Sequence, residues 1–233
     1  MTAKQHLVLV PGLLCAKGLW AAQLESLSDI ADMRIADHTR HDTMEGIAAS
    51  ILKAAPERFA LAGLSMGGYI AYEIVRQAPR RVTKLALLDT GSRADAPERA
   101  EGRGKLVALA EREGTRKAQE QLLPVLIHPS RLADKPLVEA VLAMADDIDA
   151  AAFKRQQAAI MSRPDNRPLL ASIRCPTLVL VGREDALTPV ELSQEIAAGI
   201  PGARLEIIPD CGHLSTMERP EPVNRAFRTW LTA

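Results

Sequence analysis

The sequence predicts an α/β protein, with an open and mostly parallel sheet of six strands, helices on both faces and an inserted helical cap. Three observations support this prediction. Short apolar runs recur along the 233 residues, helical patterns separate most of them, and one long stretch in the middle has helical patterns without a clear strand. Strands that alternate with helices are typical of a parallel sheet covered on both sides.

The predicted strands are short apolar runs bounded by Gly and Pro. They lie at residues 6–10, 33–37, 58–62, 84–88, 177–181 and 204–208, of which 33–37 (MRIAD) is the weakest. Most of them lack a strict alternation of polar and apolar residues, which indicates strands buried on both faces.

Helical patterns fill the intervals between these strands. They cover about 18–30, 43–54, 66–77, 189–198 and 219–231, and several begin at a capping residue or a proline. Within the insertion, a stripe of Leu137, Val138, Val141, Leu142 and Ala145 marks one face of a helix. We therefore expect a core formed by residues 1–91 and 171–233, and a helical cap formed by residues 92–170.

The composition excludes several functional classes. Lys plus Arg and Asp plus Glu both number 29, so no overall charge attracts nucleic acid or an anionic membrane. Three widely spaced cysteines, Cys15, Cys175 and Cys211, match neither a disulfide framework nor a zinc site. The apolar run near the N-terminus is interrupted too early, by Pro11 and Gly12, for a signal peptide or membrane span. We expect a cytoplasmic protein that acts on a small molecule.

A candidate nucleophile lies in the stretch GLSMGG at residues 63–68. Gly-x-Ser-x-Gly alone is a weak signal, but Ser65 follows a predicted strand and precedes a predicted helix. That context indicates a tight strand-to-helix turn that exposes the serine hydroxyl, with Gly63 and Gly67 avoiding collisions across the turn and Gly68 allowing close packing. In the alternative interpretation, Ser65 only caps the helix.

A serine nucleophile needs a base, and the base needs an orienting acid. Of the five histidines, His213 lies between the last predicted strand and the last predicted helix, at the same sheet edge as Ser65. His6 precedes a strand, His38 and His41 lie in the polar loop DHTRHD, and His128 lies in the cap. Asp185 follows the strand at 177–181, while its neighbour Glu184 should point the other way. Asp89, after the strand at 84–88, is the rival acid, although it can be explained as a cap of its own loop. The order Ser, Asp, His favours Asp185.

These motifs together resemble the α/β-hydrolase family over nearly the whole chain. VPGLLC at 10–15 resembles the oxyanion loop, GLSMGG the nucleophile turn, GREDALTP the acid loop and CGHLSTMERPE the histidine loop. The resemblance implies an oxyanion hole formed by the backbone N–H groups of Leu13 and Met66. Two segments depart from the family pattern: Pro11-Gly12 replaces His-Gly, and ADHTRHD replaces a turn rich in Pro and Gly. The first two strands of larger members are absent.

The resemblance and the three residues predict a serine hydrolase that cleaves a small to medium carboxylic ester through an acyl-enzyme, without metal or organic cofactor. Two alternatives stay open: an acyltransferase or cofactor-free perhydrolase with the same three residues, and a ligand receptor that does not turn over. Apolar cap residues are expected to cover a mostly apolar pocket or to form the core of the cap itself: Leu122, Leu123, Val125, Leu126, Ile127, Met144 and Phe153. Trp20 and Tyr69 could also border the site.

Overall fold

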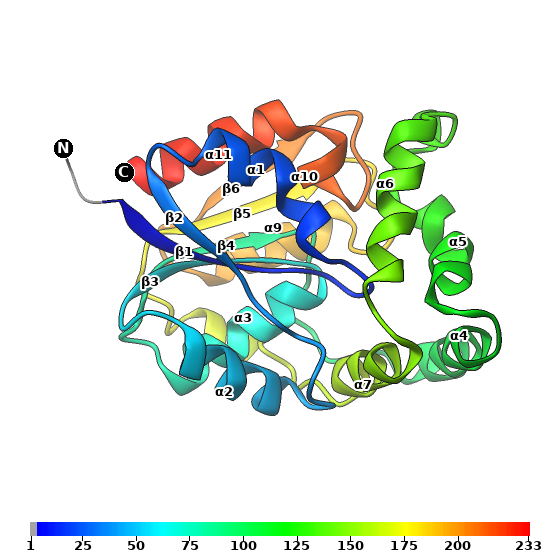
Figure 1. Ribbon diagram of the computed structural model, residues 1–233. Coiled ribbons are helices and arrows are strands. Elements are labelled where there is room, and N and C mark those ends of the chain that lie inside the picture. The colour runs from blue at the N-terminus through cyan, green and yellow to red at the C-terminus, as the bar shows by residue number, and fades with distance from the viewer. Residues whose placement is uncertain (1–3) are drawn as a thin grey trace.

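A six-stranded parallel sheet forms the centre of the molecule. The computed structural model describes residues 4–233, so the first three residues of the predicted core segment lie outside the described residues. The strand order is β2-β1-β3-β4-β5-β6, and each neighbouring pair is parallel (Figure 1). The strands are β1 (Gln5–Val10), β2 (Ala31–Ile35), β3 (Phe59–Leu64), β4 (Val82–Leu88), β5 (Thr177–Gly182) and β6 (Arg204–Ile208). The prediction of six strands is confirmed.

Helices cover both faces of this sheet. On one face lie α1 (Ala21–Ser26), α10 (Ser215–Glu218) and α11 (Pro220–Thr232), and on the other lie α2 (Met44–Ala54), α3 (Met66–Gln77) and α9 (Val190–Gly199) (Figure 1). The predicted helix at 18–30 is shorter, because a 3-10 turn, η1 (Lys17–Trp20), precedes α1 and the chain turns at Leu27. The strand predicted at 33–37 lies two residues earlier, since Ala31 pairs with Gln5 and Ile35 with Leu9.

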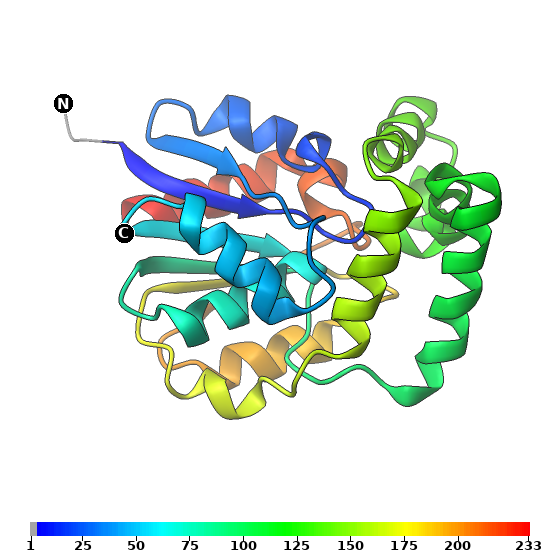
Figure 2. The same ribbon diagram turned by 60° about the horizontal axis from the view of Figure 1, so that its bottom comes forward.

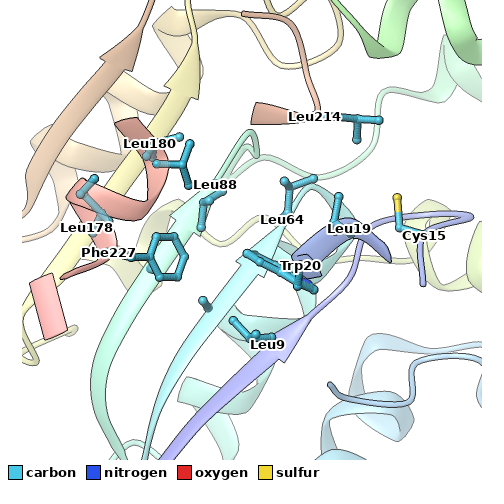
Figure 3. Packing of buried hydrophobic residues seen from close by; sticks show 14 of the residues in the cluster. Leu9, Cys15, Leu19, Trp20, Leu64, Leu88, Leu178, Leu180, Leu214 and Phe227 are labelled. Atoms are coloured by element: carbon cyan, nitrogen blue, oxygen red, sulfur yellow. The ribbon is translucent and has the colours of Figure 1, made fainter. Parts of the chain in front are cut away.

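The alternation of side chains along the strands creates an apolar layer on each face. Leu7 and Leu9 of β1 pack on the side of α11, whereas Val8 and Val10 pack on the side of α3. Figure 3 shows residues of neighbouring strands pointing toward Phe227 on the α11 side. Trp20, which could have bordered the site, packs in this layer with its ring centroid 6.1 Å from that of Phe227.

Four helices form a cap at the carboxyl ends of the strands (Figures 1 and 2). They are α4 (Ala100–Glu113), α5 (Thr115–Leu126), α6 (Lys135–Asp146) and α7 (Ala150–Met161); short elements η2 (Pro97–Arg99), η3 (Pro129–Arg131) and α8 (Arg167–Leu170) flank or connect them. The predicted stripe on α6 is buried, apart from the half-buried Val138. A small apolar cluster joins cap residues such as Phe153 to Leu14, in the loop after β1. The cap is therefore packed onto the loop that was predicted to form an oxyanion hole.

The remaining structural expectations concern cysteines, metals and membranes. Cys15, Cys175 and Cys211 are all free thiols. Within residues 4–233, no group of three or more His, Cys, Asp or Glu side chains is arranged to hold a metal ion. None of the helices in this part of the chain combines the length and the apolar character needed to cross a membrane.

Candidate active site

Ser65 lies on a strained turn between β3 and α3. Its backbone angles are φ 56° and ψ −114°, a conformation that residues with a side chain rarely adopt. The loop after β4 holds this turn in place: Ser65 N–H donates to the carbonyl of Leu88 at 2.9 Å, and Thr90 Oγ1 donates to the carbonyl of Ser65 at 2.8 Å. Ser65 makes no side-chain cap of α3, so the capping interpretation finds no support in its hydrogen bonds.

The three glycines beside Ser65 are required by close backbone approaches. A Cβ at Gly63 would lie 2.2 Å from the carbonyl oxygen of Gly67, across the turn as predicted. A Cβ at Gly67 would lie 2.1 Å from the carbonyl of Val10, so this glycine makes room for the end of β1 instead. A Cβ at Gly68 would lie 2.5 Å from Thr90 Oγ1. The glycines thus allow the turn, the first loop and the loop after β4 to meet at one point.

Hydrogen bonds join the serine, histidine and aspartate that the sequence singled out. His213 follows β6, and its Nε2 lies 2.8 Å from Ser65 Oγ. The other ring nitrogen of His213, Nδ1, lies 2.8 Å from Asp185 Oδ2. Asp185 also accepts hydrogen bonds from Leu187 N–H at 2.8 Å, Thr188 N–H at 2.9 Å and Thr188 Oγ1 at 2.6 Å. The carboxylate therefore has a fixed orientation toward the imidazole.

The electrostatics of this chain of residues favour a basic imidazole. Burial acts to raise the pKa of Asp185, but the charge of His213 and the hydrogen bonds from His213 and Thr188 outweigh it, so the pKa lies below its usual value. Burial acts to lower the pKa of His213, and the neighbouring Asp185 carboxylate outweighs it, so that pKa is raised. A charged carboxylate beside a more basic imidazole is suited to accepting a proton from Ser65 Oγ.

Asp89, the rival acid, lies in a different environment. It is completely buried, with Oδ1 accepting from Gly182 N–H at 2.9 Å and Oδ2 accepting from Ser215 Oγ at 2.5 Å. Burial, reinforced by the charge of Asp185, raises the pKa of Asp89 to about 8. It was expected to cap its own loop at Thr90 and Gly91, but it instead ties the loop after β4 to those after β5 and β6.

The two predicted oxyanion donors lie beside Ser65. Met66 is the first residue of α3, and Leu13 belongs to the loop after β1, where it lines the same cavity as Ser65. Within residues 4–233, neither the N–H of Leu13 nor that of Met66 donates to a protein acceptor. Both remain available to an oxygen atom placed near Ser65 Oγ.

His38 and Gln156 brace the first loop, a role that the sequence did not predict. His38 was placed in a polar loop, yet it is buried, with Nε2 2.9 Å from the carbonyl oxygen of Gly12. Gln156 of α7 lies 3.0 Å from the same Nε2 and accepts from Leu14 N–H at 3.4 Å. The family pattern has a His side chain directly before the glycine of this loop, where this chain has Pro11. Here the side chains that contact the loop are those of His38 and Gln156. The position of His38 in the sequence could have indicated this role, because His38 follows β2 at the same sheet edge as Ser65.

A cavity of about 100 Å³ opens at Ser65 and His213. Of the cap residues expected to cover the site, Leu122 and Leu126 line it, as does Tyr69 of the core. The other five do not: Leu123, Val125, Ile127, Met144 and Phe153. The lining is mostly apolar, as predicted, but it also includes the polar side chains of Arg99, Arg103 and Gln157 from the cap segment.

Comparison with known proteins identifies the family. Residues 7–226 match the family described as the alpha/beta hydrolase family. The chain belongs to the alpha/beta hydrolase family. Among solved structures, this hydrolase is similar to a thermophilic esterase from Thermogutta terrifontis with malate bound, at 32% identity and a TM-score of 0.89 over 99% of this chain and 90% of that one.

Curated relatives of this α/β hydrolase cleave different bonds. A 2-hydroxy-6-oxononadienedioate/2-hydroxy-6-oxononatrienedioate hydrolase from Klebsiella pneumoniae is 31% identical over 195 residues, which cover 78% of this chain and 67% of the relative. Three further hydrolases of that name are covered over only 60 to 63% of their length. A pimeloyl-(acyl-carrier protein) methyl ester esterase from Nitrosomonas europaea is 27% identical over 95% of this chain and 93% of the relative. Family membership therefore establishes a hydrolase and leaves the bond to be proposed.

Replacing Gly63 by Ala tests the close approach at the turn. The added Cβ would lie 2.2 Å from a backbone oxygen, so we expect the free energy of unfolding to fall by about 3 kcal/mol or more. Gly104→Ala in α4 is the matched control: nothing lies within 4 Å of its Cβ. That variant should be stabilised by about 0.5–1 kcal/mol, because alanine loses less backbone entropy in a helix. Urea unfolding measures the free energy of unfolding of both variants. Equal values for Gly63→Ala and wild type would contradict the prediction.

Replacing Asp89 by Asn tests its raised pKa. Because the folded-state pKa of about 8 exceeds the unfolded value of 3.8, the stabilisation from protonated Asp89 is full below the unfolded pKa and is lost as the pH rises toward 8. Asparagine does not titrate, so the free energy of unfolding of Asp89→Asn relative to wild type should increase by at least about 1 kcal/mol between pH 4 and 8.

Asp134→Asn is a control in which the pKa of the replaced aspartate is shifted in the opposite direction. A side-chain hydrogen bond from Arg131 lowers the pKa of Asp134, so its carboxylate stabilises the fold above the unfolded pKa. The difference in the free energy of unfolding between Asp134→Asn and wild type should therefore decline as the pH rises from about 2 to 5, through the unfolded pKa, and stay level from there to pH 8. A flat or declining difference for Asp89→Asn would show that Asp89 is ionised in the fold.

Proposed function

We propose that this α/β hydrolase is a serine hydrolase that cleaves a small to medium carboxylic ester through an acyl-enzyme. Ser65 is the nucleophile, His213 the general base and Asp185 the orienting acid. The observation that carries the proposal is the continuous path from Ser65 Oγ to His213 and Asp185, with 2.8 Å at each step, at the wall of a cavity. A hydroxyl, a base and an acid in this order are the requirement of nucleophilic catalysis by serine.

The first step forms the acyl-enzyme. His213 Nε2 takes the proton of Ser65 Oγ as the oxygen attacks the ester carbonyl, and the N–H groups of Leu13 and Met66 donate to the oxyanion of the tetrahedral intermediate. Asp185 accepts from His213 Nδ1–H and stabilises the imidazolium. When the intermediate collapses, His213 gives its proton to the leaving alcohol.

The second step regenerates the enzyme. His213 takes a proton from water, the resulting hydroxide attacks the acyl carbonyl, and the carboxylic acid leaves as Ser65 Oγ is reprotonated. None of these steps requires a metal ion or organic cofactor. We assign the chemistry to the core, residues 1–91 and 171–233, and the selection of the substrate to the cap, residues 92–170.

Two esterases among the relatives support the ester assignment, one of them covered over 93% of its length. The cavity supports a compact substrate, because its volume of about 100 Å³ has room for roughly three water molecules at the volume of about 30 Å³ that each occupies in liquid water. The hydrolases that act on oxononadienedioates favour a second candidate, hydrolysis of a carbon–carbon bond next to a ketone by the same residues. A panel of p-nitrophenyl esters of two to eight carbons, assayed beside a conjugated 2-hydroxy-6-oxo acid, distinguishes the two.

Ser65→Ala tests the nucleophile. We expect a loss of about a thousand-fold or more in kcat for the best ester, because only binding and the oxyanion donors remain. A fluorophosphonate should label wild type at Ser65, as located by peptide mass spectrometry. Ser193→Ala is the control: this serine is buried, its Oγ has no hydrogen-bond partner among the described residues, and it lies in α9 outside the cavity lining. Label on another serine would refute the assignment.

The comparison of Asp185→Asn with Asp89→Asn tests the acid. If Asp185 orients His213, asparagine stabilises the wrong imidazole tautomer, and kcat should fall on the order of a thousand-fold. Asp89→Asn should cost far less, since Asp89 hydrogen-bonds to Gly182 and Ser215 and not to the imidazole. Both proteins are assayed on one ester after circular dichroism has verified folding. Should Asp89→Asn be inactive while Asp185→Asn is near wild type, the acid is Asp89.

A further inference from the structure

One end of the cavity is built from hydrogen-bond donors. Arg99 of η2, Arg103 of α4 and Gln157 of α7 line the same cavity as Ser65 and His213. All three come from the inserted segment, whereas the residues next to Ser65 come from the core. The rest of the lining is largely apolar and includes Leu106, Leu122 and Ile160.

The orientation of the Gln157 amide is fixed by a contact with Arg103. Arg103 Nη1 donates to Gln157 Oε1 at 2.8 Å, so the amide oxygen is already used. Gln157 is completely buried, and within residues 4–233 its Nε2 has no acceptor. A buried donor without an acceptor is costly, so a ligand or solvent oxygen is expected to complete it. This amide is the observation that points to a ligand.

The charge at this end of the cavity is positive. Asp95, with a side chain only 4% exposed, accepts from Arg103 Nε and Nη2 at 2.8 and 3.0 Å and from Arg163 Nη1 at 2.8 Å. Two guanidinium groups thus share one carboxylate. Arg99 adds a third guanidinium, and it forms no ion pair with any part of the chain that the structure describes. The positive charge exceeds the negative charge beside the cavity.

A carboxylate accepts hydrogen bonds without donating any and carries a negative charge, so it fits a cluster of donors with excess positive charge. Its two oxygens accept several hydrogen bonds, and guanidinium groups match its geometry. We propose that Arg99, Arg103 and Gln157 form a carboxylate subsite, and that the substrate is a half-ester of a dicarboxylic acid. The free carboxylate binds under the cap while the ester carbonyl lies at Ser65. This inference rests on the proposed ester hydrolysis and specifies its substrate class.

A matched pair of substrates isolates the carboxylate. The p-nitrophenyl half-ester of glutaric acid is compared with the p-nitrophenyl ester of glutaric acid monoamide, which has the same shape without the charge. We expect kcat/KM of wild type to be about ten-fold higher for the charged ester, mainly through KM, as is typical of one charge-assisted contact. Equal values for the two esters would overturn the proposal.

Variants assign this preference to the subsite. Arg99→Gln should reduce the ratio between the two esters toward one, and Arg99→Lys should restore part of it because the charge returns. Gln157→Met, which removes both amide donors at similar volume, should also lower the ratio. Arg112→Gln is the matched control: it lies in an exposed turn of α4 outside the cavity lining and should keep the wild-type ratio. A wild-type ratio in both Arg99→Gln and Gln157→Met would overturn the proposal.

Binding of glutarate provides a readout that does not need turnover. Titration calorimetry should give a Kd for wild type that weakens about ten-fold in Arg99→Gln and stays unchanged in Arg112→Gln. An unchanged Kd in Arg99→Gln would contradict the subsite even if esters were cleaved. If no ester were cleaved and no fluorophosphonate label appeared on Ser65, the proposed ester hydrolysis would fail, and the glutarate titration would still decide whether the carboxylate subsite exists.

Discussion

The strained backbone of Ser65 is the constraint on which the rest of the site depends. A residue at φ 56° and ψ −114° is held there only if its neighbours leave no alternative, and here the neighbours come from β1 and β4. The loop after β4 holds both the N–H and the carbonyl of Ser65. The end of β1 lies so close to the turn that only glycine fits at position 67. The loop after β1, which continues from this point, lines the same cavity as Ser65 with Gly12 and Leu13.

Parallel strands explain why distant residues meet at this turn. All six strands point the same way, so the loops after β3, β4, β5 and β6 open at one edge, although Ser65 and His213 lie 148 residues apart in sequence. Asp89 connects three of these loops through its contacts with Gly182 and Ser215. A protonated carboxyl can fill this position without a buried negative charge next to Asp185. Burial raises the pKa of Asp89 to about 8, whereas the contact with His213 lowers the pKa of Asp185 despite its burial.

Local patterns were sufficient for the six strands and for the residues near Ser65, because apolar runs, glycines and loop order are properties of neighbouring residues. The start of β2 was missed by two residues, since pairing with Gln5 decides it and MRIAD alone does not. His38 was missed for a similar reason: its burial arises from Gly12 and Gln156, 26 and 118 residues away. The sequence indicated that the cap is helical, but it did not indicate which side chains of these helices line the cavity. Of seven apolar candidates only Leu122 and Leu126 do.

The cap differs from the core in the kind of contact that determines its position. Polar contacts bind α7 to the core through Gln156 and Leu14, and to α4 through Gln157 and Arg103. Gln156 and Gln157 are adjacent in sequence, yet one braces the loop that carries Leu13 and the other lies at the polar end of the cavity. A change in the position of α7 would therefore alter both the loop that carries Leu13 and the donors of Arg103 and Gln157. In this architecture, one helix of the cap supports the loop after β1 and also contributes to the lining of the cavity.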